Sequence, residues 1–261
     1  MSPARPVTER FSDRVDDYLR GRPGYPPELY DALIESTGLA PGARIADLGS
    51  GTGLSTEPLL GRGFELFAVE PNEPMRRAAA ARLGSHPTFH SVAGSAEATG
   101  LAPASIDVAI AFQAFHWFDV AKTRAELERI LVPGGSVALV WNARRAAGTP
   151  LLEEYEALLL AFGTDYRQVG HRGLPRERLA ALYGGPFAHR RFANHQDLDL
   201  DGLRARLLSS SYVPAAGHPD HAPMLAELER IFRAHAEDGT VRLEYDVDLY
   251  VGALTRSDSR A

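Results

Sequence analysis

The sequence contains no cysteine, and Lys122 is its only lysine. Without cysteine, disulfides, thiolate metal sites and a cysteine nucleophile are excluded. Arginine carries almost all of the positive charge, which argues against Schiff-base chemistry. The phosphate-loop pattern G-x-x-x-x-G-K-S/T does not occur either.

Long apolar runs and surplus positive charge are also lacking. No apolar run is long enough to span a bilayer, and the opening MSPARPVTERFSDR lacks the apolar core of a secretory signal. The formal net charge is −6, whereas a nucleic-acid surface needs a basic patch. We therefore expect a cytoplasmic protein that binds neither nucleic acid nor membrane. We also expect a monomer or homodimer. No histidine cluster has convincing metal-ligand spacing, so no metal site is expected.

The 261 residues, 44% of them hydrophobic, suit one large domain with a proper core. Helix-like and strand-like stretches alternate up to residue 141, which indicates β-α-β units and a parallel sheet. Apolar runs such as VAIAF and VALVW are typical of strands covered on both faces. We expect helices over 27–37, 55–63, 73–84 and 120–131, a turn at 132–135, and strands within 41–49 and over 64–70, 87–94, 105–112 and 136–141.

After about residue 150 the pattern changes. Helices are expected over 151–162, 175–184, 201–211 and 222–237, and strands over 187–200 and 240–254. The predicted fold class is α/β: a Rossmann-like, mostly parallel, seven-stranded sheet with helices on both faces and a helical insert over the carboxyl ends of the strands.

Three glycines alternate in IADLGSGTG, directly after the first apolar run. Glycine lets a ligand approach the main chain closely, and a glycine-rich turn between strand and helix commonly holds a nucleotide-like ligand. A dinucleotide fingerprint would need a third glycine at position 54, where the chain has Leu54. Asp47 instead precedes the glycines, where its charge favours a cationic ligand. Glu70 ends the second strand, where a carboxylate can accept ribose hydroxyls.

These features resemble the class I S-adenosylmethionine-dependent methyltransferases over residues 44–142. IADLGSGTG is similar to the first motif of that family, AVEPNEPM to its ribose-binding motif, and GSAEATGLAPASIDVAIAFQAFHWF to the next two. RPGYP near the start and HWF after the fourth strand resemble a subset that includes enzymes acting on small molecules. The resemblance implies methyl transfer from S-adenosylmethionine to a small molecule, with S-adenosylhomocysteine as product.

Cofactor contacts carried over from the resemblance form one set of predictions. Asp47, Gly49 and Gly51 would cradle the methionine portion, Glu70 the ribose, and Asn72 and Met75 the adenine. Ser95 and Ala96 would meet the adenine edge, with serine standing where many relatives have aspartate. Gln113 would lie near the methionyl amino group through its backbone carbonyl.

The stretch QAFHWFD follows the fourth strand, at the edge of the sheet where α/β proteins hold their ligands. His116 is the predicted general base, because an imidazole can take a proton from the acceptor near neutral pH. Phe115 and Trp117 are predicted to line the substrate pocket. The alternative for all three residues is simple packing.

The resemblance also divides the single domain, 1–261, into three parts. Residues 1–27 would fold over the cofactor, with Arg22 on its carboxylate and Tyr18 facing the sulfonium. Residues 28–145 would form the cofactor-binding core, and residues 146–261 the substrate-side helical insert and closing strands. The Arg- and Ala-rich, Lys-poor composition indicates a high-GC bacterial genome, where enzymes of this kind often modify secondary metabolites.

Three other functions stay open at this point. A nicotinamide-dependent oxidoreductase is disfavoured by Leu54, Asp47 and the lack of a Tyr-x-x-x-Lys pair. A nucleic-acid or protein methyltransferase is disfavoured by the lack of a basic stripe and of an Asn-Pro-Pro-Tyr motif. A cofactor-binding protein without catalysis fits the same residues.

Overall fold

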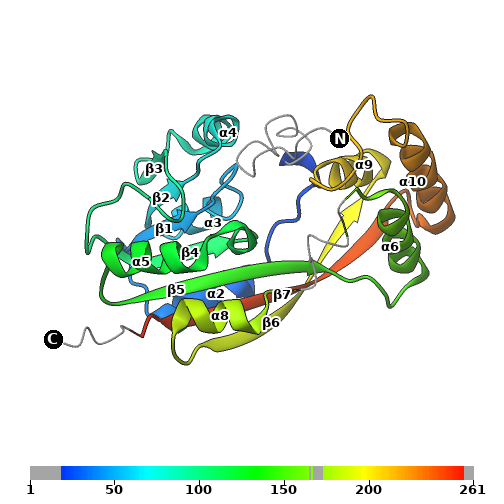
Figure 1. Cartoon of the computed structure of the whole chain (residues 1–261). Coiled ribbons are helices and arrows are strands. Elements are labelled where there is room, and N and C mark those ends of the chain that lie inside the picture. The colour runs from blue at the N-terminus through cyan, green and yellow to red at the C-terminus, as the bar shows by residue number, and fades with distance from the viewer. Residues whose placement is uncertain (1–18, 165, 167–172, 256–261) are drawn as a thin grey trace.

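One twisted sheet of seven strands forms the centre of the computed structural model, which describes residues 19–164, 166 and 173–255 (Figure 1). The strand order is β3-β2-β1-β4-β5-β7-β6. Strands β1 to β5 pair in parallel, whereas β7 pairs antiparallel with both β5 and β6. This arrangement confirms the predicted Rossmann-like, mostly parallel α/β fold.

The expected elements are present with modest shifts of their ends. The strands are β1 (Arg44–Leu48), β2 (Glu65–Val69), β3 (Phe89–Val92), β4 (Ile106–Phe112), β5 (Leu131–Arg144), β6 (Ala188–Leu198) and β7 (Val241–Ala253). The helices are α2 (Pro27–Thr37), α3 (Glu57–Leu60), α4 (Glu73–Leu83), α5 (Val120–Ile130), α6 (Pro150–Phe162), α8 (Arg176–Tyr183), α9 (Leu200–Leu208) and α10 (His221–His235), with the short 3-10 helix η2 (Phe115–Trp117).

Two sequence predictions were wrong in detail. The helix expected over 55–63 is the single turn α3, because Ser55 and Thr56 use their hydroxyls on Asp47 and the chain turns again after Gly61. The turn expected at 132–135 lies within β5 as an irregularity, where the pairing with β4 shifts register and Gly134 adopts a φ of 83°. Strand β5 therefore begins at Leu131, five residues before the predicted strand.

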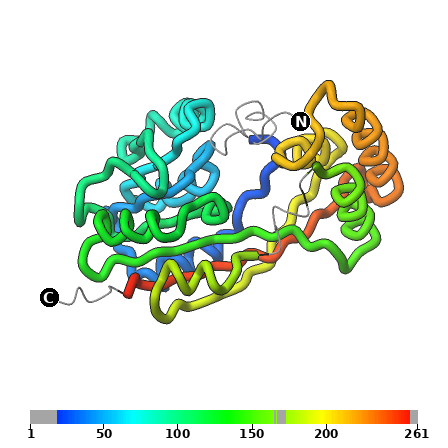
Figure 2. The backbone as a smooth tube through the Cα atoms, viewed as in Figure 1, coloured from blue at the N-terminus to red at the C-terminus, as the bar shows by residue number. Residues whose placement is uncertain are grey.

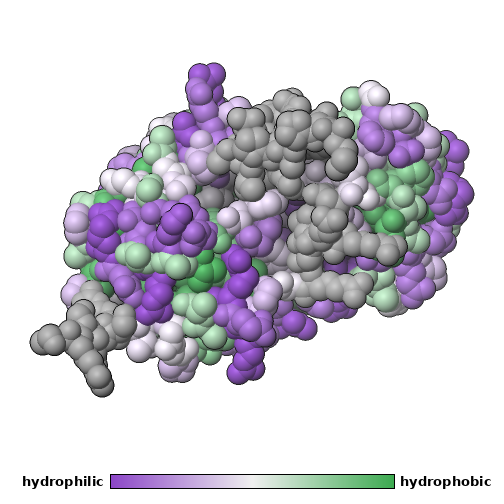
Figure 3. Space-filling model, viewed as in Figure 1, coloured by the Kyte–Doolittle hydropathy of each residue, from purple (hydrophilic) through white to green (hydrophobic). Residues whose placement is uncertain are grey.

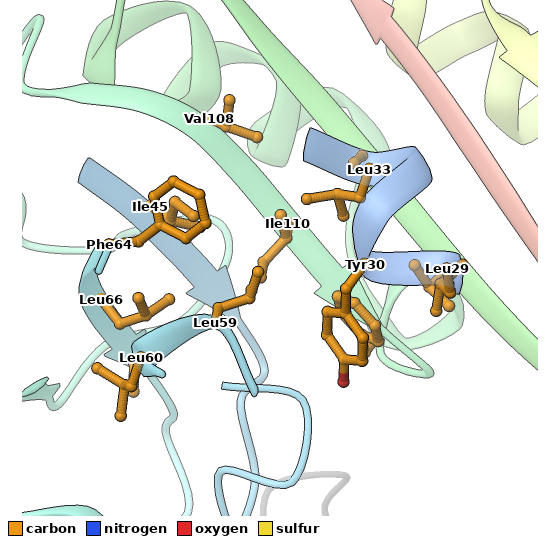
Figure 4. Close-up of a cluster of buried hydrophobic side chains, with 14 of the residues drawn as sticks. Leu29, Tyr30, Leu33, Ile45, Leu59, Leu60, Phe64, Leu66, Val108 and Ile110 are labelled. Atoms are coloured by element: carbon orange, nitrogen blue, oxygen red, sulfur yellow. The ribbon is translucent and has the colours of Figure 1, made fainter. Parts of the chain in front are cut away.

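Hydrophobic side chains cover both faces of the sheet. On one face, α2 and α3 pack on β1, β2 and β4, as Figure 4 shows for Leu29, Leu33, Leu59, Ile45 and Ile110. On the other face, α5 and α8 pack on the alternate residues of β4 and β5. Apolar strand residues on both sides explain why the central strands read as continuous apolar runs.

The insert has its own hydrophobic cluster, formed by α6, α9, α10 and the first half of β7. The long strands β6 and β7 run from this cluster back into the sheet, so that α6, α9 and α10 lie at one end of the molecule (Figure 2). Helix α8 is the exception among the insert helices, since it covers a face of the sheet beside α5. Figure 3 shows hydrophobic residues at the α6 and α10 end, where Leu160 is 42% exposed.

A short segment before α2 joins the sheet to the insert. Gly21 is buried, and a Cβ atom there would lie 2.4 Å from the backbone carbon of Ala205 on α9. Arg22 donates a hydrogen bond to the backbone oxygen of Ser209, just after that helix. The side chains of Asn194 and Gln196 on β6 donate to the backbone oxygens of Gly24 and Gly21. The lack of a side chain at Gly21 is what allows this close approach to α9.

Gly21→Ala should lower the free energy of unfolding by about 1–3 kcal/mol, the usual cost of forcing extra volume into a packed site. Gly24→Ala is the matched control, because nothing lies within 4 Å of a Cβ atom built there. Urea titration of both variants measures the difference. Equal stability of the two variants would show that the segment does not pack tightly on α9.

Candidate functional site

A cavity lies at the carboxyl ends of β1, β2, β4 and β5, bounded on its far side by the insert. Parallel strands end at a common edge, so residues that follow them meet there. The cavity is lined by most of the predicted site residues: Arg22, Gly49, Gly51, Glu70, Asn72, Met75, Ser95, Ala96, Gln113, His116 and Trp117. Asp47 and Phe115 do not line it, and Tyr18 lies outside the described residues.

The glycine loop after β1 forms one wall. Gly49 and Gly51 have φ values of 70° and 56°, in the left-handed region that other residues adopt at a cost. A Cβ atom at Gly49 would also lie 2.6 Å from the Cβ atom of Ala114, whereas nothing lies within 4 Å of one at Gly51. The loop therefore leaves open space beside Gly51 for a ligand against the main chain.

Glu70 links this loop to the second strand. One carboxylate oxygen accepts the N–H of Gly51 at 3.0 Å, and the other accepts the N–H of Asn72 at 2.8 Å. Burial raises the pKa of the Glu70 carboxyl, while these two N–H groups oppose that rise. A carboxylate has further lone pairs, so Glu70 can still accept hydroxyl groups of a ligand in the cavity.

The start of α4 and the loop after β3 form the next part of the wall. The side chain of Asn72 caps α4 by accepting the N–H of Met75 at 3.0 Å, so both residues are fixed in place. Met75 is 3% exposed and contributes an apolar surface. Beside it, the hydroxyl of Ser95 accepts the N–H of Glu97 at 3.3 Å, and Ala96 is buried. This mixture of a flat apolar surface and polar edges suits a heteroaromatic ring.

Asp47 lies beneath the glycine loop. One of its oxygens accepts the hydroxyls of Ser55 at 2.8 Å and Thr56 at 2.7 Å, and the other is buried without a hydrogen bond from the described residues. Burial raises the pKa of Asp47 to about 6, although the two hydroxyls lower it. Asp47 is thus not among the residues that line the cavity, although a direct contact with a ligand was predicted for it. Asp47 holds the turn from below and places a buried acid beneath the cavity.

Gln113 follows β4 with a φ of 55°. Its side chain donates to the backbone oxygen of Asn142 at 3.0 Å and accepts the N–H of the same residue at 2.8 Å. Both ends of the amide are therefore used on β5. The main chain of Gln113 is what remains for a ligand, in keeping with the predicted backbone contact.

Aromatic rings surround His116 in η2. The ring centroids of His116 and Trp117 lie 4.2 Å apart, and those of His116 and Trp141 lie 5.0 Å apart. Phe115 is 1% exposed in the core below, so it supports the loop instead of facing the cavity. Arg178 on α8 donates to the backbone oxygens of Phe115 at 3.1 Å and Phe118 at 2.8 Å. The insert thereby fixes the loop that carries His116.

Sequence reasoning missed several lining residues. Trp141 ends an expected strand, so the rule that placed Glu70 could also have found it. Ser211 and Tyr212 follow α9 in the insert, and no local pattern marks them. Arg178 is equally unmarked, since α8 reaches η2 only through tertiary packing. The other lining residues not predicted are Pro71, Glu97, Phe112, Ala114 and Phe118.

The described part of the chain contains neither a membrane-spanning helix nor a cluster of metal-ligating side chains. No helix among residues 19–164 and 173–255 is long and apolar enough to cross a membrane. Within the same ranges, no group of three or more histidine and acidic side chains is arranged to hold a metal ion.

Comparison with known proteins identifies a methyltransferase domain over residues 46–139. An uncharacterized methyltransferase of Mycobacterium tuberculosis is 40% identical over 140 residues, which are 54% of this chain and 55% of that protein. An uncharacterized methyltransferase of Schizosaccharomyces pombe is 31% identical over 154 residues, 59% of this chain and 60% of its own length. The chain thus spans about half the length of the curated relatives it matches.

Solved structures share the whole fold. A provisionally named type II methyltransferase from Anaeromyxobacter dehalogenans is 28% identical, with a TM-score of 0.69 over 90% of this chain and 99% of that one. Phosphoethanolamine N-methyltransferase 2 of Haemonchus contortus is 13% identical, with a TM-score of 0.58 over 98% of this chain and 62% of that one, and so shows the fold alone. Residues 46–139 thus form a methyltransferase domain, and this domain, these relatives and the glycine loop clamped by Glu70 support a class I S-adenosylmethionine-dependent methyltransferase.

Proposed function

We propose that this protein transfers a methyl group from S-adenosylmethionine to a small-molecule acceptor. The observation that carries the proposal is the buried carboxylate of Glu70, held by the N–H groups of Gly51 and Asn72 at the edge of the cavity. A carboxylate fixed there is suited to accept two neighbouring hydroxyls of a ribose.

The other walls fit the rest of the same ligand. The open space beside Gly51 leaves room against the main chain, and Met75 with Ala96 offers an apolar surface for a base. Asp47 supplies negative charge beneath the loop, and Arg22 lines the cavity. When bound, S-adenosylmethionine supplies an electrophilic methyl group on a sulfonium.

His116 is proposed as the base that takes the proton of the acceptor. Its ring lines the cavity between Trp117 and Trp141, and Arg178 fixes the backbone on either side. The two indoles place apolar surface beside the imidazole, and alignment of two bound molecules there would supply much of the rate of a methyl transfer. General-base help contributes typically about 10²–10⁴-fold to a rate.

A small molecule is favoured over a macromolecule as acceptor. The cavity is bounded by Ser211 and Tyr212 of the insert, and the net charge is −6. A nucleic-acid acceptor needs a basic surface to bind phosphates. We also infer a cytoplasmic location and a role in bacterial secondary metabolism, as a monomer or homodimer. A cofactor-binding protein without catalysis would bind S-adenosylhomocysteine yet release no methyl group to any metabolite pool.

Glu70→Ala should weaken binding of S-adenosylhomocysteine by about 1.5–3 kcal/mol, the scale for losing hydrogen bonds to a charged group. Isothermal titration calorimetry measures the change. Glu65→Ala is the matched control, because Glu65 lies at the opposite end of β2 and contacts His90. Unchanged affinity in Glu70→Ala would refute the ribose role.

Asp47→Asn should remove a pH-dependent loss of stability. The unfolded carboxyl has a pKa of about 3.9, and the folded one has a pKa of about 6. The native state therefore binds more protons between these values, and Asp47 makes stability fall as pH rises from about 4 to about 6. In full, Asp47 lowers the free energy of unfolding by about 3 kcal/mol, and this loss is complete above pH 6.

Urea titrations of wild type and Asp47→Asn at several pH values test this expectation. Glu70 is present in both proteins, and its repulsion with Asp47 is part of the difference that the comparison measures. The difference in unfolding free energy should shift in favour of Asp47→Asn as pH rises through this window. Parallel curves would show that Asp47 does not titrate there.

His116→Ala should lower turnover by about 10²–10⁴-fold while the affinity for S-adenosylhomocysteine stays the same, because Glu70 and the glycine loop remain. Methyl release on metabolite pools measures the turnover, and calorimetry measures the affinity. His195→Ala on the exposed part of β6 is the control. Near wild-type turnover would make His116 a packing residue.

A further inference from the structure

Arg206 is an unusual cation in this protein because it is buried without an acid. The residue is 6% exposed on α9. Its Nε donates to the hydroxyl of Tyr245 at 3.0 Å and its Nη1 to the hydroxyl of Ser210 at 3.2 Å. Both partners are neutral, and no carboxylate of the described residues pairs with it. Three of the five guanidinium N–H groups thus have no acceptor among the described residues.

The neighbouring arginine on the same helix shows the contrast. Arg204 forms ion pairs with Asp201, at 3.0 Å, and with Glu229, and it is partly exposed. Burial of a cation without an opposite charge costs several kcal/mol. A bound anion would remove that cost at Arg206.

The free side of Arg206 faces a small cavity. Arg22 lines the same cavity, together with Tyr25, Asn142 and Tyr245, and no acidic side chain of the described residues does. The side-chain oxygen of Asn142 is buried without a hydrogen bond from the described residues, and its amide can rotate to present N–H groups instead.

The small cavity adjoins the proposed reaction site. Arg22 and Gln113 line both cavities, and the small one has a volume of about 20 Å³. That volume admits one or two oxygen atoms. A planar carboxylate fits this space better than a tetrahedral phosphate.

We propose that Arg206 forms a carboxylate-binding subsite, separate from the cofactor contact predicted for Arg22, and that it receives a carboxylate of the methyl acceptor. The inference rests on the proposed function and narrows the acceptor to a carboxylic acid. Arg206 belongs to the insert and lines the small cavity, whereas Glu70 lines the larger one. The same chemistry could serve the methionine carboxylate of the cofactor, and the experiment separates the two sources.

The experiment uses the full chain saturated with S-adenosylhomocysteine. A panel of short- and long-chain carboxylic acids, each beside its primary amide, is titrated by calorimetry and offered in a methyl-release assay with S-adenosylmethionine. Wild type should bind and methylate at least one acid and none of the matching amides. Arg206→Met should weaken binding of that acid roughly thirtyfold or more, the effect of removing one partner of a buried charge pair. Its affinity for S-adenosylhomocysteine should stay within about twofold of wild type.

Arg204→Met is the matched control and should leave binding of the acid unchanged. Arg206→Lys keeps the charge with fewer donors and should give an intermediate effect, so an unstable Met variant does not end the test. If Arg206→Met weakened binding of S-adenosylhomocysteine tenfold, the subsite would serve the cofactor and the inference would be overturned. The inference would also be overturned if wild type bound acids and amides equally well, or if wild type and Arg206→Met bound the acid equally well. Failure of wild type to bind S-adenosylhomocysteine would instead refute the proposed function.

Discussion

The carboxylate of Glu70 is the contact on which the cavity depends. It joins the glycine loop after β1 to the start of the segment leading into α4, through the N–H groups of Gly51 and Asn72. The parallel pairing of β1 with β2 makes this contact geometrically natural, because both strands end at the same edge. Without that acceptor, the N–H groups of Gly51 and Asn72 would lose their hydrogen-bond partner. The loop would then lose the contact that holds its shape.

Acidic groups near the cavity are held at a cost to stability. Burial raises the pKa values of both Asp47 and Glu70, so each carboxyl is less stable as an anion here than in water. Such strain is common where a protein prepares charge for a ligand. In this protein Glu70 and Arg22 line the larger cavity, Asp47 lies beneath its glycine loop, and Arg22 and Arg206 line the small cavity beside it. The site therefore carries charges of both signs.

The insert completes the site from outside the sheet. Helix α8 reaches η2 through Arg178, which fixes the backbone around His116, and α9 brings Arg206 to the small adjoining cavity. The segment before α2 joins the insert to the sheet, because Gly21 packs directly on the backbone of α9. Packing between distant parts of the chain thus decides where the acceptor can lie.

The sequence by itself determined the strand and helix pattern of the first half, the glycine loop and the position of Glu70. Local periodicity and turn residues carry that information, and the parallel sheet follows from it. Only the tertiary structure decided that Phe115 points into the core, that Asp47 lies beneath the loop, and that Arg206 is buried without an acid. Which face a side chain takes, and which distant residue it meets, depends on packing between elements far apart in the chain, and no local pattern records it.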